Sequence, residues 1–246
     1  MSIVKNFLGR ILAFWTLLVF SVTLLIVLIP IWAIYKQPEP KRSVILQKIF
    51  TGWMKVFFVL IGVRRIIKGK GNFKKDENYI VVCNHSSFMD VPLSTASIPG
   101  PTKTIAKIEM SRIPLFGVVY KSGSVIVDRK SEESRKLSYR KMKEVLDMGL
   151  HMCIYPEGTR NKTGEPLQRF HDGAFRLAEE TNKAIIPAII LNTKKVLPPD
   201  KKFFFWPHNV QMHFLPAVEI TNQTVQQLKE QVFSLMKNYY ISKNPQ

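Results

Sequence analysis

The longest uncharged stretch of the chain is the feature that most constrains its fold. Residues 11–35, between Arg10 and Lys36, include no charged side chain. A helix of about 25 residues is roughly 37 Å long, enough to cross the hydrocarbon core of a bilayer with some tilt. A cleaved signal peptide is the competing interpretation, but its apolar core is shorter and ends in a small-x-small site. Because Pro30, Trp32 and Tyr35 stand where small residues would be needed, we expect a retained membrane anchor.

A second apolar stretch, residues 44–63, is interrupted by Lys48 and Lys55. The two lysines fall on one face of a helix, which suits an amphipathic helix lying in the membrane interface. A helix packed into a soluble core is the alternative, and a second full span is less favoured. A chain of 246 residues can hold one sizeable α/β domain and a short appendage. We expect a membrane-anchoring helical hairpin in residues 1–63 and a catalytic domain in residues 64–246.

The charge balance points to an anionic partner. The chain carries 36 Lys and Arg residues against 18 Asp and Glu, a net charge of +18. The apolar N-terminus favours a membrane surface or a phosphorylated substrate over nucleic acid. Within residues 36–75, Glu39 is the only acidic residue among many Lys and Arg, so this segment is expected at the anionic face of the inner (cytoplasmic) membrane. The catalytic domain would then face the cytoplasm. Whether the first helix spans the bilayer or lies in one leaflet stays open, as does the oligomeric state.

The two cysteines, Cys83 and Cys153, each lie inside a short apolar run. Their spacing suggests neither a disulfide framework nor a metal site, so they are interpreted as reduced core residues. A catalytic Cys83 is the alternative, although a small hydrophobic residue in a strand is the simpler interpretation. No metal and no bound cofactor are expected.

Beyond residue 63, short apolar runs alternate with helical patterns, which is typical of an α/β domain with a mostly parallel or mixed sheet flanked by helices. Helices are predicted at residues 131–148, 172–181 and 221–241, the first opened by Ser131 and ended by Gly149. Strands are predicted at residues 65–70, 79–83, 102–106, 124–127, 151–155, 184–191 and 210–216.

The residues after the second predicted strand can carry catalysis. His85 follows the buried-type run that ends at Cys83, and the carboxyl ends of strands are where α/β enzymes place their sites. On a continuous helix, His85 and Asp90 would be about 140° apart and would not meet. If a helix starts at Ser87, however, Asp90 in its first turn can reach back to the imidazole. The spacing from Ser87 to Asp90 also fits a capping box, in which Asp90 only caps the helix and His85 is a loop histidine.

A His–Asp pair of this kind has a clear chemical use. One imidazole nitrogen can accept a proton from a hydroxyl while the other donates to the carboxylate, which fixes the tautomer. General-base assistance contributes about 10² to 10⁴ in rate. The neighbouring Ser86 and Ser87 offer a second mechanism, in which a serine is acylated first and His85 activates it. Direct transfer to the substrate hydroxyl ranks higher, because it needs no relay.

Two further strand ends finish in residues that suit an anion. After the fifth predicted strand, Gly158 would let backbone N–H groups approach an anion and Arg160 would bind phosphate bidentately. After the fourth, Asp128 is followed by Arg129. A surface turn and a solvated strand end are the alternatives. Three such strand ends meet at one edge of a sheet more naturally than they scatter.

These motifs together resemble those of the 1-acyl-glycerol-3-phosphate acyltransferases, which show Asn-His-x4-Asp, Gly-x-x-x-(Ile/Val)-Asp-Arg, (Phe/Tyr)-Pro-Glu-Gly-Thr-Arg and an apolar segment around a proline. All four occur here in order, at residues 84–90, 123–129, 155–160 and 185–188. The resemblance implies that His85 and Asp90 form the catalytic pair. It also implies that the acceptor is bound by Arg129, Glu157, Gly158, Thr159 and Arg160.

Lys107 matches a basic position that such enzymes use toward the phosphate. The chain departs from the family there, since members often show Lys-Lys-Glu-Leu where this chain has Ala106-Lys-Ile-Glu-Met; a solvated lysine is the alternative.

The resemblance implies transfer of an acyl group from acyl-CoA or acyl carrier protein to the sn-2 hydroxyl of lysophosphatidic acid, which gives phosphatidic acid. Acylation of another lysolipid or of glycerol 3-phosphate, hydrolysis of the thioester, and lipid binding without catalysis are the competing functions. The motifs report neither the donor nor its chain length.

Overall fold

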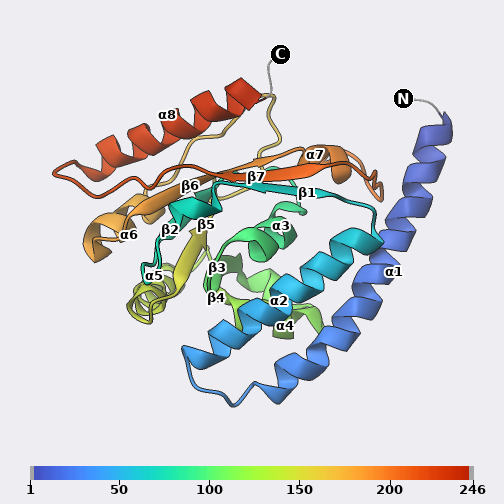
Figure 1. Cartoon of the computed structure of the whole chain (residues 1–246), viewed down its shortest axis with the longest axis horizontal. Coiled ribbons are helices and arrows are strands. Elements are labelled where there is room, and N and C mark those ends of the chain that lie inside the picture. The colour runs from blue at the N-terminus through green and yellow to red at the C-terminus, as the bar shows by residue number, and fades with distance from the viewer. Residues whose placement is uncertain (1–2, 244–246) are drawn as a thin grey trace.

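The computed structural model describes residues 3–243. Its first two helices, α1 (Ile3–Ala33) and α2 (Lys41–Leu60), form the expected N-terminal hairpin and lie side by side (Figure 1). Both are long and apolar enough to cross a membrane by length and composition. At the tip of the hairpin, Glu39 accepts hydrogen bonds from Arg42 and from Lys103 of the sheet, at 2.8 Å each, so the tip is tied to the α/β domain.

A seven-stranded mixed sheet forms the centre of the molecule, and the expected fold class is confirmed. The strand order is β1-β7-β6-β2-β5-β3-β4, and every neighbouring pair is parallel except the antiparallel pair of β6 and β7. The seven strands are β1 (Arg65–Lys68), β2 (Ile80–Cys83), β3 (Thr102–Lys107), β4 (Ser124–Val127), β5 (His151–Ile154), β6 (Ile185–Leu191) and β7 (Val210–Phe214). Every predicted strand is therefore present.

The sequence predicts the longer helices of the α/β domain but not the short ones. The three predicted helices appear as α5 (Glu132–Asp147), α6 (Gly173–Thr181) and α8 (Val225–Lys243). Ser131 caps α5, because its hydroxyl accepts a hydrogen bond from the Ser134 N–H at 3.1 Å. The remaining helical elements are α3 (Asp90–Ser97), α4 (Phe116–Gly123), α7 (Thr193–Val196) and two 3-10 turns, Lys70–Asn72 and Ile108–Arg112.

Helices cover both faces of the sheet (Figure 1). Ile80 and Val82 of β2 pack with α5, α6 and α8, while Val81 and Cys83, which point to the other face, pack with α2 and α3. On that second face the buried side of α2 joins the core of the sheet, and Lys48 and Lys55 are exposed on its opposite side. The second apolar stretch is thus an amphipathic helix whose apolar face is packed on the α/β domain. This packing matches the alternative of a helix packed into the core.

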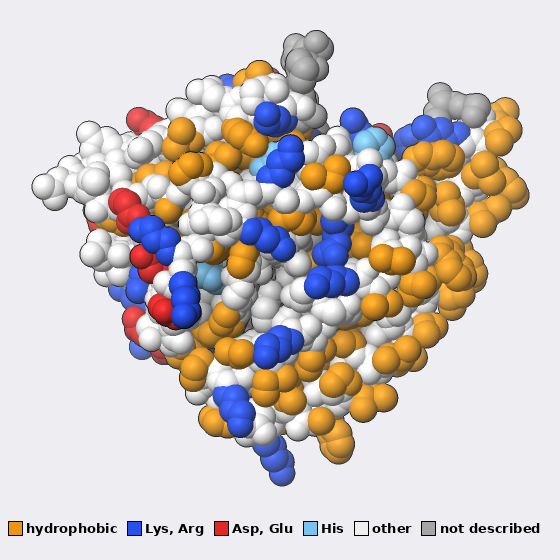
Figure 2. Space-filling view, in the orientation of Figure 1, with side chains coloured by type: hydrophobic (Ala, Val, Ile, Leu, Met, Phe, Trp, Pro, Cys, Tyr) orange, Lys and Arg blue, Asp and Glu red, His pale blue; other side chains and the backbone are white. Residues whose placement is uncertain are grey.

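The outer side of α1 is a continuous apolar surface. Most of its buried residues pack against α2 and α4, while many of its large apolar residues are exposed, among them Phe7, Phe14, Leu25 and Trp32. Figure 2 shows these hydrophobic side chains gathered along the edge of the molecule that α1 occupies in Figure 1. Exposed apolar surface of this extent marks a membrane or partner contact in a stable protein.

Candidate functional site

The imidazole of His85 is held by Asp90. His85 Nδ1 lies 2.9 Å from Asp90 Oδ2 in a region where Asp90 is fully buried and the His85 side chain is 18% exposed. The same carboxylate oxygen accepts the backbone N–H groups of Ser86 at 2.5 Å and Ser87 at 2.8 Å. Because a carboxylate is a hydrogen-bond acceptor, we assign the ring proton to Nδ1, which leaves Nε2 as the acceptor nitrogen. The two residues are therefore brought together as the sequence predicts.

This contact arises at the first turn of α3, which begins at Asp90 rather than at Ser87. The predicted capping box forms only in part: Asp90 accepts the Ser87 N–H, but the Ser87 hydroxyl donates to the Leu197 carbonyl at 2.9 Å. One carboxylate makes both of the contacts that the sequence suggested. Asp90 organises the backbone that leads into α3, and it orients the His85 ring.

The neighbouring serines are used elsewhere. The Ser86 hydroxyl lies 3.3 Å from the hydroxyl of Thr193, and the Ser87 hydroxyl is bonded to Leu197, so both are directed to the segment after β6. Both serines are buried. Within residues 3–243, neither hydroxyl is hydrogen-bonded to His85, which counts against a serine relay.

Glu157, after β5, locks the His85 backbone. Its Oε1 accepts the His85 N–H at 2.7 Å, its Oε2 accepts the Gln168 N–H at 3.0 Å, and the Asn161 N–H donates to the His85 carbonyl at 2.7 Å. This arrangement follows from the strand order, because β2 and β5 are neighbours and parallel, so their carboxyl ends meet. Burial raises the pKa of Glu157 to about 6, although its two backbone N–H partners favour the charged form.

The turn after Glu157 carries the anion-suited residues. Gly158 has φ +69, a conformation that L side chains rarely adopt. Thr159 is exposed on the turn, and the Arg160 guanidinium carbon lies 3.6 Å from the ring centroid of Phe88, within the segment that joins His85 to Asp90. The stacking therefore places a positive charge over the loop of residues 84–89, which joins β2 to α3.

Two more predicted residues, Lys107 and Arg129, lie at the carboxyl ends of β3 and β4. Arg129 Nη1 donates to the Gly158 carbonyl, so its side chain crosses from the edge strand to the turn. Burial lowers the pKa of Arg129 from its ordinary value. Lys107 ends β3 and is exposed; among the described residues, no hydrogen bond or ion pair links it to His85 or Arg160.

An apolar cavity of about 820 Å³ begins beside this site. Phe88, Met89 and Arg160 line it near His85. From there it runs between α1, α2, α3 and α4, where Phe50, Trp53, Phe57, Val91, Phe116 and Val119 line it. Its walls are mostly apolar and aromatic, as in sites that bind hydrocarbon groups.

Sequence reasoning missed the residues that support the site. Tyr155 packs its ring 4.6 Å from the His85 ring, and its hydroxyl lies 2.8 Å from that of Ser94. Asn84 bonds the Ile190 backbone through both amide atoms, at 3.0 and 2.7 Å, which fixes the start of the loop of residues 84–89 to β6. Both residues belong to the motifs already noted, so their position gave a signal, but their partners are distant in the chain.

Comparison with known proteins gives concordant results. A family model described as acyltransferase matches residues 64–191. The chain is 27% identical to the 1-acyl-sn-glycerol-3-phosphate acyltransferase of Borreliella burgdorferi over 77% of this chain and 75% of that protein. It is 33% identical to the enzyme of the same name from Helicobacter pylori, over 57% of this chain and 58% of that protein. The crystal structure of the 1-acyl-sn-glycerophosphate (LPA) acyltransferase from Thermotoga maritima has the same fold, with a TM-score of 0.81, 22% identity and 97% coverage of both chains.

Proposed function

Because the chain belongs to the acyltransferase family, we propose that it transfers an acyl group from acyl-CoA or acyl carrier protein to the sn-2 hydroxyl of 1-acyl-sn-glycerol 3-phosphate. The product is phosphatidic acid, so the reaction belongs to phospholipid biosynthesis. The observation that carries the proposal is the bond of 2.9 Å between His85 Nδ1 and the buried carboxylate of Asp90. The similarity to the 1-acyl-sn-glycerol-3-phosphate acyltransferases of Borreliella burgdorferi and Helicobacter pylori supports the choice of acceptor.

His85 acts as the general base in this reaction. Its Nε2 takes the proton of the acceptor hydroxyl as the hydroxyl oxygen attacks the thioester carbonyl carbon. Asp90 stabilises the imidazolium that forms and holds the ring in place. A carbon–oxygen bond forms, the carbon–sulfur bond breaks, and the proton passes from Nε2 to the departing thiolate. No serine relay is needed.

The acceptor phosphate binds at the turn after β5. Arg160 supplies a planar guanidinium, held by Phe88, that can bind phosphate oxygens bidentately. Arg129, Lys107, Gly158 and Thr159 complete this side of the site at the same sheet edge. Glu157 contributes by positioning: both of its oxygens accept backbone N–H groups, including that of His85.

The apolar cavity receives a hydrocarbon chain. It begins at Phe88 and Arg160, beside the loop of residues 84–89, and continues between the hairpin and the sheet. A chain bound there would place its carbonyl end near His85. Burial of each methylene contributes about 0.8 kcal/mol, so the depth of this cavity sets the chain-length preference.

The hairpin holds the enzyme on the inner membrane with the catalytic domain in the cytoplasm. The apolar outer face of α1 is the membrane contact. Since the other face of α1 is packed against α2 and α4 along the helix, α1 lies in one leaflet rather than across the bilayer. The basic segment of residues 36–75 adds attraction to anionic lipids.

A panel of acceptors tests the function. Purified protein receives one labelled acyl-CoA or acyl carrier protein with lysophosphatidic acid, another lysophospholipid, glycerol 3-phosphate or no acceptor. Labelled phosphatidic acid formed only with lysophosphatidic acid supports the proposal. Preferential acylation of another acceptor would replace it, and release of free fatty acid at the same rate without acceptor would make the protein a thioesterase.

A further inference from the structure

The segment of residues 197–206, between α7 and β7, is packed against the N-terminal half of α1; it is called the 197–206 loop below. The Phe205 N–H donates to the Gly9 carbonyl at 3.0 Å. A Cβ on Gly9 would lie 2.1 Å from the Phe204 ring, so only glycine admits this contact. Lys5 Nζ lies 4.9 Å from the ring centroid of Trp206. The loop and the helix therefore form one surface.

Phe203 projects from this loop in an unfavourable way for a protein in water. Its side chain is 53% exposed and its φ is +50, in the left-handed region that bulky residues rarely adopt. Its neighbours Phe204 and Phe205 are buried. The strained backbone at Phe203 therefore leaves one of three consecutive aromatic rings exposed. An apolar environment outside the protein would favour this exposed ring.

A second exposed apolar residue with positive φ lies next to another contact with α1. Leu115, immediately before α4, is 53% exposed and has φ +61. The next residue, Phe116, packs 5.8 Å from Phe20 of α1, measured between ring centroids. Two exposed apolar residues with positive φ, Leu115 and Phe203, therefore each precede an aromatic residue that packs on α1.

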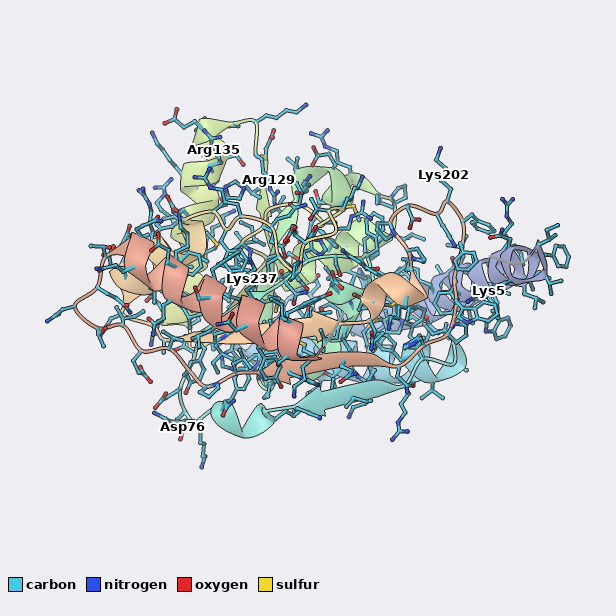
Figure 3. All side chains as sticks on the ribbon, turned by 90° about the horizontal axis from the view of Figure 1, so that it is seen from above. Lys5, Asp76, Arg129, Arg135, Lys202 and Lys237 are labelled. Carbon is cyan, nitrogen blue, oxygen red and sulfur yellow. The ribbon has the colours of Figure 1, made fainter. Side chains whose placement is uncertain are left out.

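Charge and the cavity specify what this surface contacts. Lys201 and Lys202 precede Phe203, and Figure 3 shows Lys202 projecting from the end of the molecule where Lys5 of α1 also lies. Apolar tips beside lysines are typical of segments at the interface of an anionic bilayer. Phe203 and Lys202 also line the apolar cavity, together with the exposed residues Leu17 and Phe88. The mouth of the cavity therefore opens within this surface.

We propose that the 197–206 loop is a second membrane contact, which inserts Phe203 into an anionic phospholipid bilayer. The contact itself does not depend on which reaction the protein catalyses.

A spin label at position 203 tests the contact directly. Because Cys83 and Cys153 are buried, a Phe203→Cys variant of the full chain offers one accessible thiol. On vesicles of phosphatidylcholine with phosphatidylglycerol, the label should become accessible to oxygen and protected from a water-soluble nickel complex. The matched control is Leu137→Cys on α5, 42% exposed and on the opposite face of the sheet, which should stay accessible to nickel. A label at 203 that stays accessible to nickel on bound protein overturns the proposal.

The lysine contribution has its own control. Lys202→Ala should weaken partition onto vesicles that contain phosphatidylglycerol about fivefold, and leave partition onto pure phosphatidylcholine unchanged. Lys141→Ala, an exposed lysine on α5, should change neither. Equal effects of the two variants on partition would contradict the placement of Lys202 at the surface of the bilayer. These readouts involve no catalysis, so a protein that fails to acylate lysophosphatidic acid can still pass them, and an active one can fail them.

Discussion

Asp90 Oδ2 accepts a hydrogen bond from His85 Nδ1 at 2.9 Å while it also accepts the backbone N–H groups of Ser86 and Ser87. One buried oxygen thus fixes the ring and the loop that carries it. The spacing of five residues would separate the two side chains on a helix, and they meet because the helix begins only at Asp90. The loop conformation and the orientation of the His85 ring therefore depend on the same carboxylate.

Replacing this carboxylate tests its double role. Asp90→Asn keeps the size of the side chain but removes the charge that favours the imidazolium, so kcat for acyl transfer should fall by about 10² to 10⁴. Asp172→Asn, at a partly exposed carboxylate paired with Lys229, is the control and should leave kcat unchanged. The assay is a steady-state rate with saturating donor and acceptor. An Asp90→Asn enzyme with normal kcat contradicts the pairing.

Arg160 should act on acceptor binding. A charged hydrogen bond to phosphate contributes about 1.5 to 3 kcal/mol, so Arg160→Ala should raise the KM for lysophosphatidic acid roughly 10- to 100-fold. Arg160→Lys should recover only part of this loss, because lysine lacks the planar fork that lies over Phe88. Acceptor titrations at saturating donor give KM and kcat separately. If only the donor KM changed, Arg160 would belong to the donor side.

Narrowing the cavity should change the chain-length preference. Val119 lines the cavity from α4, and Val119→Phe would shorten the space for a hydrocarbon chain. Each methylene that no longer fits costs about 0.8 kcal/mol, or about fourfold in affinity, so the variant should favour shorter acyl chains. Competition among acyl thioesters or lysolipids of different lengths measures this and identifies which chain the cavity holds. The same relative rates for all lengths would exclude the cavity as the chain site.

Glu157 should leave a signature in the pH dependence of stability. Burial raises its pKa from the ordinary 4.5 to about 6, so the folded state holds this proton more tightly than the unfolded chain does. Its contribution to the free energy of unfolding is full below pH about 4.5 and falls by about 2 kcal/mol as pH rises through 6. Glu157→Gln should lack this fall, besides losing stability at every pH from a missing backbone acceptor. Denaturant titrations of both proteins across this range, in detergent, give the difference; parallel curves would contradict the raised pKa.

Local pattern foretells much of this fold. All seven strands follow from short apolar runs, and α5, α6 and α8 follow from the helical stretches between or after them, with Ser131 as the cap of α5. The prediction that motif residues meet at one sheet edge also holds for His85, Glu157 and Gly158, since β2 and β5 are parallel neighbours.

What the pattern could not foretell depends on contacts between distant segments. The start of α3 at Asp90 is set by bonds from Ser86 and Ser87 and by the Ser87 hydroxyl, which is drawn to Leu197. The cavity needs α2, α4 and the hairpin to be placed together, and α4 is too short to show a clear period. The contact of Arg129 with Gly158 likewise requires the sheet order.

The most direct test of the proposed function is the formation of phosphatidic acid by His85→Ala compared with the unaltered protein. Both are given labelled acyl thioester and lysophosphatidic acid in vesicles, and circular dichroism and vesicle flotation check that the variant is folded and membrane-bound. Without the general base, product formation should fall to the background of the uncatalysed reaction, with folding and binding intact. Turnover by a folded His85→Ala protein at the rate of the unaltered enzyme would contradict the assignment of His85.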